Sequence, residues 1–205
     1  MSSERLPDRY FDDLYAGAAD PWGFQDRWYE RRKRALTTAL LPRPRYRYGF
    51  EPGCSLGVLT EALAGRCDQL LATDVSPAAL AAAQGRLAGQ DHVRFRCWAL
   101  GDPWPDGPFD LVVLSEVLYY LRAPLLRRVL HQAAAALEPG GTLLAVHWRH
   151  PVTDYPLGGD EVHAELGRTP GLVGTARYQD LDVLAECFLR TPPDPVWVAT
   201  AEGLV

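Results

Sequence analysis

The sequence has little of what marks a secreted, membrane-spanning or metal-binding protein. It has four cysteines, no two of them spaced as C-x-x-C, which argues against a zinc site or a thioredoxin-type motif. Their neighbours are apolar, so we expect Cys54, Cys67, Cys97 and Cys187 to be buried free thiols in a reducing cytoplasm. The N-terminus, MSSERLPDRY, lacks the apolar core of a signal peptide, and no apolar run reaches the roughly 18 residues that span a membrane.

Charge of one sign is not in large excess either. The 205 residues carry a formal net charge of −5, which does not favour a polyanionic partner such as nucleic acid. No repeat, low-complexity tract or linker divides the chain, so we expect one domain over 1–205. Within it we expect an N-terminal lid (1–41), a cofactor-binding core (46–148), and an acceptor loop with an edge hairpin (149–205).

Apolar runs and turn residues alternate in the order of strands and helices. The pattern predicts strands at 46–51, 69–74, 93–98, 109–115 and 142–148, with helices at 27–41, 58–66, 76–89 and 123–141. A short helix near 160–167 and two strand-like runs, 173–180 and 181–189, follow, and their tight spacing suggests an antiparallel hairpin. Ser76 is expected to cap its helix. This order predicts an α/β fold with a Rossmann-like, doubly wound, seven-stranded sheet that is mainly parallel.

The stretch GFEPGCSLGVLTEAL (49–63) has the form of a cofactor loop, since a strand ends at Glu51 and a helix follows Gly57. Parallel sheets bind ligands at the carboxyl ends of their strands. A dinucleotide site would have G-x-G-x-x-G, but Ser55 replaces the middle glycine, and Glu51 would repel a diphosphate. Glu51 would attract an ammonium group, and Asp74, ending the next strand, can accept from ribose hydroxyls. A nucleoside with a cationic amino-acid tail, such as S-adenosylmethionine, fits this pattern of residues. The alternative is that the stretch is a plain strand-to-helix turn with no ligand.

This stretch resembles the first two motifs of class I S-adenosylmethionine-dependent methyltransferases. In that family the glycine loop wraps the methionine portion and the acid after the second strand holds the ribose. The resemblance implies a cofactor site made of Glu51, Gly53, Ser55, Gly57, Asp74, Val75, Trp98, Ala99 and Ser115. Val75 would flank the adenine, and Trp98 would stack on it, because Asp102 falls too late to match the family's acid after the third strand.

The segment SEVLYYL (115–121) follows the fourth strand, where this family faces the transferred methyl group. It lacks the N/D-P-P-Y/F motif of DNA-adenine and glutamine methyltransferases, which argues against those substrates. Glu116 and Tyr119 are the polar groups expected to reach the site, whereas Tyr120 has a core position as its alternative.

The segment HWRHPVTDYPLGGDEVH (147–163) is dense in polar and aromatic residues, as functional loops are. It predicts an acceptor cleft lined by His147, Arg149, His150, Asp154, Tyr155, Asp160 and His163. A metal site is an alternative, but the histidine spacing matches no known signature, so no metal is expected. A solvated loop with satisfied histidines is the other alternative.

Four segments together are similar to the nodulation protein S group of methyltransferases, and the resemblance covers nearly the whole chain. They are LYAGAADPWGFQDRWYERRK (14–33), FEPGCSLGVLTEALAGRCD (50–68), SEVLYYL and HWRHPVTDYPLGGDEVH. Members of that group N-methylate a deacetylated chitooligosaccharide, and some related sequences are fused or adjacent to a sugar N-deacetylase. The resemblance implies a small-molecule acceptor with a free amine, of the amino-sugar type, and a functional pairing with such a deacetylase.

The resemblance also implies that the N-terminal segment is a lid, in which Trp22 and Tyr29 shield the sulfonium. For RWYERRKR (27–34) the alternatives are a solvated helix face or a nucleic-acid contact. Since an amine must be neutral to attack, Glu116 is the first candidate for a base, and His150 the second. Other readings are an O-methyltransferase, in which His147 or His150 gains importance, an NAD-dependent oxidoreductase, and a non-catalytic cofactor-binding subunit.

Overall fold

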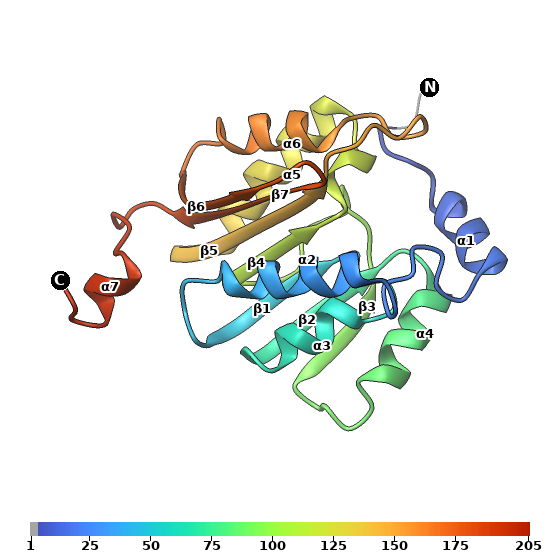
Figure 1. Cartoon of the computed structure of the whole chain (residues 1–205), viewed down its shortest axis with the longest axis horizontal. Helices are drawn as coiled ribbons and strands as arrows, with labels where there is room; N and C mark the ends of the chain where they lie inside the picture. Colours follow the sequence, from blue (N-terminus) through green and yellow to red (C-terminus); the bar gives the residue numbers. More distant parts are fainter. Residues whose placement is uncertain (1–3) are drawn as a thin grey trace.

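The chain folds around one seven-stranded sheet with the strand order β3-β2-β1-β4-β5-β7-β6 (Figure 1). The structure is a computed structural model that describes residues 4–205, so the first three residues of the expected lid lie outside the described residues. The strands are β1 (Tyr46–Pro52), β2 (Cys67–Asp74), β3 (Val93–Cys97), β4 (Phe109–Ser115), β5 (Leu137–Trp148), β6 (Leu172–Gln179) and β7 (Val183–Arg190). Strands β1 to β5 pair in parallel, and β7 is antiparallel to both β5 and β6. The expected fold class is confirmed.

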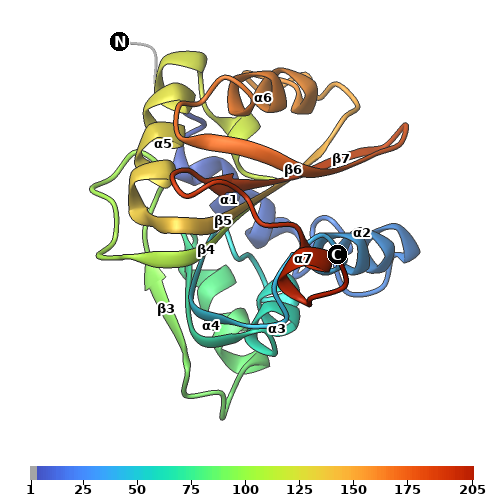
Figure 2. The same cartoon turned by 90° about the vertical axis from the view of Figure 1, so that its left-hand side faces the viewer.

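Helices cover both faces of the sheet (Figures 1 and 2). They are α1 (Asp8–Gly17), α2 (Trp28–Ala39), α3 (Val58–Ala64), α4 (Pro77–Arg86), α5 (Ala123–Ala136), α6 (Gly159–Leu166) and α7 (Val198–Ala201), with a 3₁₀ turn η1 (Leu118–Tyr120). Helices α2, α3 and α4 pack on one face, and α5 and α6 on the other. Helix α5 buries Leu125, Leu126, Val129 and Leu130, whose spacing places them on one helical face. Each side of the sheet therefore has its own apolar core.

Three expectations, one about a helix boundary and two about side chains, need correction. Residues 137–141 begin β5 and do not end a helix, because Pro139 restricts its predecessor to extended backbone and Leu137 pairs with Phe109 in the sheet. Cys97 is exposed, while the other three cysteines are buried. Ser76 makes no side-chain cap, and its hydroxyl is buried without a partner. Helix α1 was not anticipated, although its half-buried side chains, Tyr10, Phe11, Leu14 and Tyr15, recur at helical spacing.

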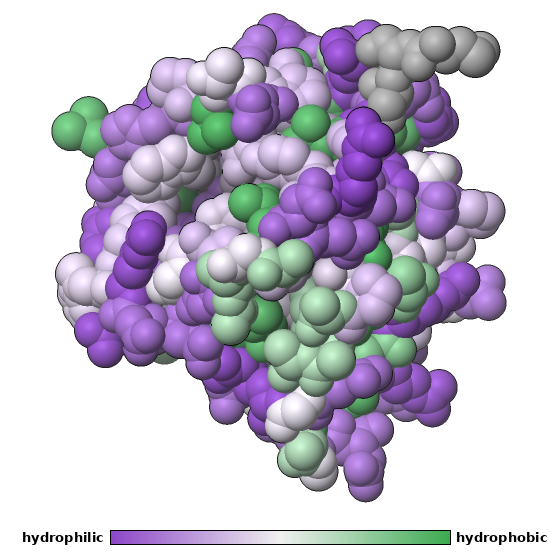
Figure 3. All heavy atoms as spheres, turned by 90° about the vertical axis from the view of Figure 1, so that its right-hand side faces the viewer, coloured by the Kyte–Doolittle hydropathy of each residue, from purple (hydrophilic) through white to green (hydrophobic). Residues whose placement is uncertain are grey.

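The N-terminal segment crosses over the carboxyl ends of the parallel strands. Helix α1 contacts α4, and the face that carries both is mostly hydrophilic, with hydrophobic residues in scattered patches (Figure 3). Among residues 4–205, no helix is long and apolar enough to cross a membrane.

The strand order reverses between β1 and β4, and a sheet of this kind binds ligands at such a switch point. We therefore expect a ligand site there, beneath the N-terminal segment.

Candidate active site

A cavity of about 330 Å³ lies at the carboxyl ends of β1, β2 and β4, beneath the N-terminal segment. Most of the residues that the sequence assigned to the cofactor line it: Glu51, Gly53, Ser55, Asp74, Val75, Trp98, Ala99, Ser115, Trp22 and Tyr29. Gly57 does not line it and sits at the N-cap of α3. Segments far apart in the sequence thus meet at one place.

The glycine loop has the backbone of a tight cradle. Gly53 has a φ of 73°, and a Cβ there would clash with Cγ1 of Val117, so the position strongly favours glycine. Ser55, at the position of the missing middle glycine, has a φ of 49°, in the left-handed region that favours glycine. Its hydroxyl lies 2.5 Å from that of Tyr15 on α1, and this contact ties the loop to the lid.

Asp74 anchors the same loop. Its carboxylate oxygens accept hydrogen bonds from the backbone N–H of Ser55, at 2.9 Å, and of Ser76, at 3.0 Å. Burial raises the pKa of Asp74, and these backbone donors oppose the rise. The side chain still borders the cavity, where a ribose hydroxyl can donate to its remaining lone pairs.

Glu51 is a buried carboxylate without a full set of partners. The residue is 2% exposed, it lines the cavity, and its Oε2 atom has no hydrogen-bond partner. Burial raises the pKa of Glu51 to about 8. A ligand with an ammonium group would satisfy this orphaned oxygen, so the donor and acceptor set fits the amino-acid end of S-adenosylmethionine.

The expected adenine region is built on a buried aromatic cluster. Trp98 packs edge-to-face against Phe50 and Trp104, with ring centroids 5.5 and 5.4 Å apart, and its indole N–H donates to the carbonyl of Pro103. Asp102 does not line the cavity, but its carboxylate accepts from the N–H of Ala99 at 3.3 Å. Only part of the Trp98 ring is therefore left to face a ligand.

The Glu116 side chain accepts three hydrogen bonds at the wall of the cavity. Its Oε1 accepts from Nζ of Lys33 at 2.7 Å, and its Oε2 accepts from the Tyr119 hydroxyl and from the backbone N–H of Trp148 at 2.9 Å. Its backbone has a φ of 58°, a strained conformation for a residue with a side chain. These bonds hold the strained turn after β4 in place.

Lys33 joins α2 to this turn through a buried charge cluster. Besides Glu116, it bonds Glu30 at 3.0 Å, and both Glu30 and Lys33 are 6% exposed. Burial lowers the pKa of Lys33, but the two carboxylates outweigh that effect and the net shift is upward. Burial raises the pKa of Glu30, against the lowering effect of Lys33.

Aromatic side chains of the N-terminal segment complete the walls of the cavity. Trp22 packs edge-to-face on Tyr15 at 5.6 Å, and Tyr29 packs edge-to-face on Trp148 at 5.1 Å. The Tyr29 hydroxyl is buried and has no hydrogen-bond partner. The cavity therefore combines carboxylates with aromatic faces, a combination suited to a cationic ligand.

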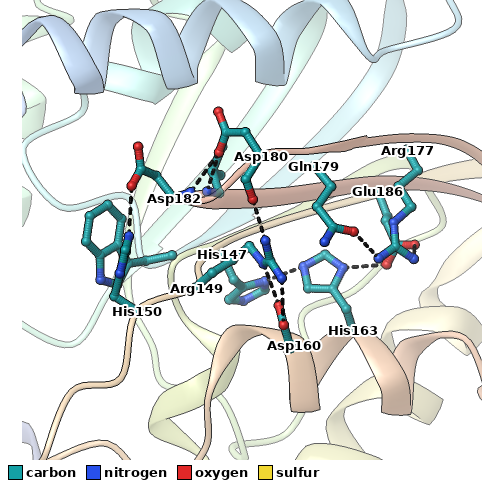
Figure 4. A network of polar contacts seen from close by, with 12 residues as sticks. His147, Arg149, His150, Asp160, His163, Arg177, Gln179, Asp180, Asp182 and Glu186 are labelled. Carbon is teal, nitrogen blue, oxygen red and sulfur yellow. Dashed lines mark hydrogen bonds and ion pairs between the residues drawn. The ribbon is translucent and has the colours of Figure 1, made fainter.

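Of the residues expected to bind the acceptor, only Tyr155 lines the cavity, where it stacks on Tyr119 at 4.8 Å; Trp148 and Val152 of the same loop also line it. His147 and His163 are 0% and 5% exposed and lie behind the cavity wall (Figure 4). Asp154 borders a neighbouring hollow, which shares Tyr155 with this cavity. The expectation that these three residues contact an acceptor in this cavity is corrected: β5 turns His147 into the core, His163 on α6 bonds it there, and Asp154 lies outside the cavity.

Arg149, His150 and Asp160 also lie outside the cavity, in polar contacts of their own (Figure 4). Arg149 makes a two-pronged pair with Asp160, at 2.8 and 2.9 Å, and Nε2 of His150 lies 2.8 Å from Asp182. The ring of His150 packs on Trp148, with centroids 4.5 Å apart, so it lies just outside the wall. Across residues 4–205, no group of three or more His, Cys, Asp or Glu side chains is placed to hold a metal ion.

The sequence reasoning missed several residues that line the cavity, chiefly Tyr15, Phe24, Glu30 and Lys33. Glu30 and Lys33 are in the charged run RWYERRKR, in which nothing distinguishes the two inward positions from the solvated ones. Their spacing of three residues was the only available signal, since it places both on one helical face.

Comparison with known proteins supports a methyl-transfer site. The methyltransferase domain family matches residues 50–143. A crystal structure of a Pseudomonas syringae protein classed as a methyltransferase is 45% identical, with a TM-score of 0.70, over 80% of this chain and 100% of that one. The N-methyltransferase NodS of Bradyrhizobium japonicum, in complex with S-adenosyl-L-homocysteine, is 28% identical, with a TM-score of 0.81, over 91% of this chain and 98% of that one.

Nodulation protein S of Sinorhizobium fredii is 31% identical over 132 residues, which are 62% of this chain and 60% of that protein. The chain thus spans less than two thirds of the length of this relative. The expected cofactor is confirmed at the level of the family, and the reading as an NAD-dependent oxidoreductase is set aside. The chain belongs to the class I S-adenosylmethionine-dependent methyltransferases, and among them it resembles nodulation protein S.

Proposed function

We propose that the protein transfers a methyl group from S-adenosylmethionine to a free amine of a small molecule, an amino sugar or a related glycan. The similarity to proteins named N-methyltransferase supports the reaction type. The resemblance to the nodulation protein S group supports the acceptor class, and with it a functional pairing with a sugar N-deacetylase that would expose the amine. The four free cysteines support a reducing, cytoplasmic location.

The charge of the Glu30–Lys33–Glu116 cluster is the observation that carries this proposal. Two carboxylates and one ammonium leave one excess negative charge within this cluster, whereas Arg27 and Arg34 line the cavity elsewhere, and Tyr29 and Trp148 add aromatic faces beside the cluster. An acceptor that arrives as an ammonium ion is attracted to both, and an aromatic face beside a cation contributes about 0.5–2 kcal/mol. A neutral hydroxyl acceptor would gain much less.

When bound, S-adenosylmethionine supplies a methyl group that is already activated. The chain's own task is then to hold and align the reactants, which is worth about 7–11 kcal/mol in well-oriented reactions. We assign Glu51 to the ammonium group of the methionine portion and Asp74 to the ribose. Tyr15, Trp22 and Tyr29 exclude water from above.

Glu116 is the residue to which we assign removal of the amine proton. Its Oε1 accepts only from Lys33, so one lone pair is left for a proton donor. Tyr119 and the Trp148 amide fix Oε2 and so orient the carboxylate. His150 is a weaker candidate, because it lies outside the cavity and bonds Asp182.

Two linked experiments test the function. Calorimetric titration with S-adenosyl-L-homocysteine should give binding, and titration with NAD should give none. Radiolabelled methyl transfer should then be seen with glucosamine and deacetylated chitooligosaccharides, and not with their N-acetylated forms. Binding of the thioether together with transfer only to hydroxyl compounds would favour the O-methyltransferase reading, and binding without transfer to any acceptor would favour a cofactor-binding subunit.

A further inference from the structure

Three buried or half-buried titratable side chains form a chain behind the cavity wall (Figure 4). His147 comes from β5, His163 from α6 and Glu186 from β7. Nδ1 of His147 lies 3.1 Å from Nε2 of His163, and Nδ1 of His163 lies 2.6 Å from a carboxylate oxygen of Glu186. None of the three lines the cavity.

The direction of the hydrogen bonds in this chain follows from its inner end. Nε2 of His147 lies 3.3 Å from the backbone N–H of Leu118. A backbone amide only donates, so Nε2 must be unprotonated and the proton of His147 must be on Nδ1. His147 therefore donates to His163, and His163 in turn donates to Glu186, whose other oxygen accepts from Arg177 at 3.2 Å.

The inner end of the chain is attached to the reactive turn. Leu118 begins η1, which carries Tyr119, and the ring of Tyr119 packs edge-to-face on His147 with centroids 5.3 Å apart. The next residue of β5, Trp148, donates its N–H to Glu116. The end of β5 thus holds the turn at both Glu116 and Leu118, and a strained residue such as Glu116 persists only when its surroundings fix it.

We propose that His147, His163 and Glu186 are positioning residues, which hold the Glu116–Tyr119 turn in its reactive geometry through the Leu118 amide. They act on the reaction only through that turn and do not touch the acceptor. The hydrogen-bond chain itself is independent of the reaction, whereas its effect on turnover rests on the proposed function.

Two pairs of variants test the chain. His163→Phe removes both ring nitrogens at similar size, and His131→Phe is its control, since His131 is exposed on α5. Glu186→Leu removes the acceptor, whereas Glu186→Gln keeps an acceptor oxygen and should largely restore the wild-type behaviour. The second pair decides the matter if His163→Phe does not fold.

The first readout is by NMR on the protein without any acceptor. In the wild type the two histidine N–H protons should resonate far downfield and the Leu118 amide should exchange slowly. His163→Phe and Glu186→Leu should lose the His163 signal and speed Leu118 exchange about tenfold, the equivalent of one hydrogen bond. His131→Phe and Glu186→Gln should stay within about threefold of the wild type. Unchanged exchange at Leu118 in both disruptive variants would overturn the proposal.

The second readout separates positioning from binding and from general damage. In His163→Phe, kcat should fall by about tenfold or more, while the Kd of S-adenosyl-L-homocysteine should stay within about twofold. A loss of cofactor affinity equal to the loss of kcat would overturn the positioning role. If the wild type transfers no methyl group at all, the proposed function has failed, and the NMR result alone decides whether the chain holds the turn.

Discussion

The carboxyl group of Glu51 lacks a full set of hydrogen-bond partners in the protein, so its protonation state should change when a ligand binds. Because the pKa of Glu51 is raised to about 8, the free protein keeps this group neutral at pH 7. A bound ammonium favours the carboxylate, so binding should release a proton, and affinity should rise with pH. We expect the affinity for S-adenosyl-L-homocysteine to increase by up to about tenfold per pH unit between about pH 6 and pH 7.5.

Calorimetry in two buffers of different ionisation enthalpy counts that proton. Glu51→Gln should bind S-adenosyl-L-homocysteine more weakly and without the pH dependence. If proton release persists in this variant, the released proton comes from another group.

The raised pKa of Glu51 also affects the stability of the fold. The folded state binds more protons than the unfolded state between pH 4.5, the ordinary pKa of a glutamate, and about pH 8, so this carboxyl group makes the protein less stable as pH rises through that window.

Glu116→Gln tests the assignment of the base. The substitution keeps the size of the side chain and removes its capacity to take a proton, so turnover should fall by about a hundredfold or more. The Kd of S-adenosyl-L-homocysteine should change by less than about twofold, because we assign cofactor binding to Glu51 and Asp74. Glu202→Gln is the control, since Glu202 is exposed near the C-terminus. Full activity in Glu116→Gln would remove Glu116 from the mechanism.

At the scale of elements, the glycine loop depends on a close approach between two loops that follow neighbouring strands. Gly53→Ala would place a methyl group against Val117 at a positive φ, so we expect a loss of about 1–3 kcal/mol in the free energy of unfolding. Gly85→Ala, within α4 and with nothing within 4 Å, should instead gain about 0.5–1 kcal/mol. Urea denaturation measures both. Val117→Ala should recover part of the loss in Gly53→Ala, and equal effects at the two glycines would contradict this account.

Helix α2 offers a matched pair of ion pairs, one buried and one exposed. Lys33→Met leaves Glu30 and Glu116 buried without their shared cation, so we expect a loss of about 3–5 kcal/mol in unfolding free energy. Arg32 pairs with Asp180 at a 37% exposed position, and Arg32→Met should cost far less than Lys33→Met. Adding Glu30→Gln to Lys33→Met should restore part of the loss. Similar losses of unfolding free energy for Lys33→Met and Arg32→Met would show that burial does not determine how much the Glu30–Lys33–Glu116 cluster contributes to stability.

The elements also show what a sequence can predict. The sequence predicts strand β4 correctly because FDLVVLS is apolar except at Asp110 and Ser115, as expected of a strand buried on both faces. The cofactor residues followed from a rule of topology, since Glu51 and Asp74 end neighbouring parallel strands. Lys33 could not be found, because its burial depends on where α2 docks, and that is decided by tertiary contacts.

His147 illustrates a different limit. Its position within the expected strand was known, but which face it would take depended on the register of β5 against β7 and on α6 covering it. Polar residues near a site are expected to face the ligand, whereas here they pair with one another in the core. A sequence does not reveal such partners when they come from three separate elements.

At the scale of the whole molecule, cofactor binding should stabilise the fold because the site joins the lid to the sheet. A ligand at 100 times its Kd adds about 2.7 kcal/mol to the folded state, so S-adenosyl-L-homocysteine should raise Tm by several degrees and NAD should not. In Asp74→Ala the rise should be much smaller at the same ligand concentration. An undiminished rise in Asp74→Ala would show that the ribose is held elsewhere.

Three of the six tryptophans line the cavity, and each belongs to a different part of it. Trp22 is in the lid, Trp98 borders the expected adenine region, and Trp148 stands beside Tyr29 and Glu116. Indole emission depends on the surroundings of the ring, so the protein carries its own optical probes for the two substrates. In variants that keep a single tryptophan, with the other indoles replaced by phenylalanine, the fluorescence of Trp98 would report cofactor binding and that of Trp148 would report acceptor binding. The order in which the two substrates enter can then be recorded without attaching a dye.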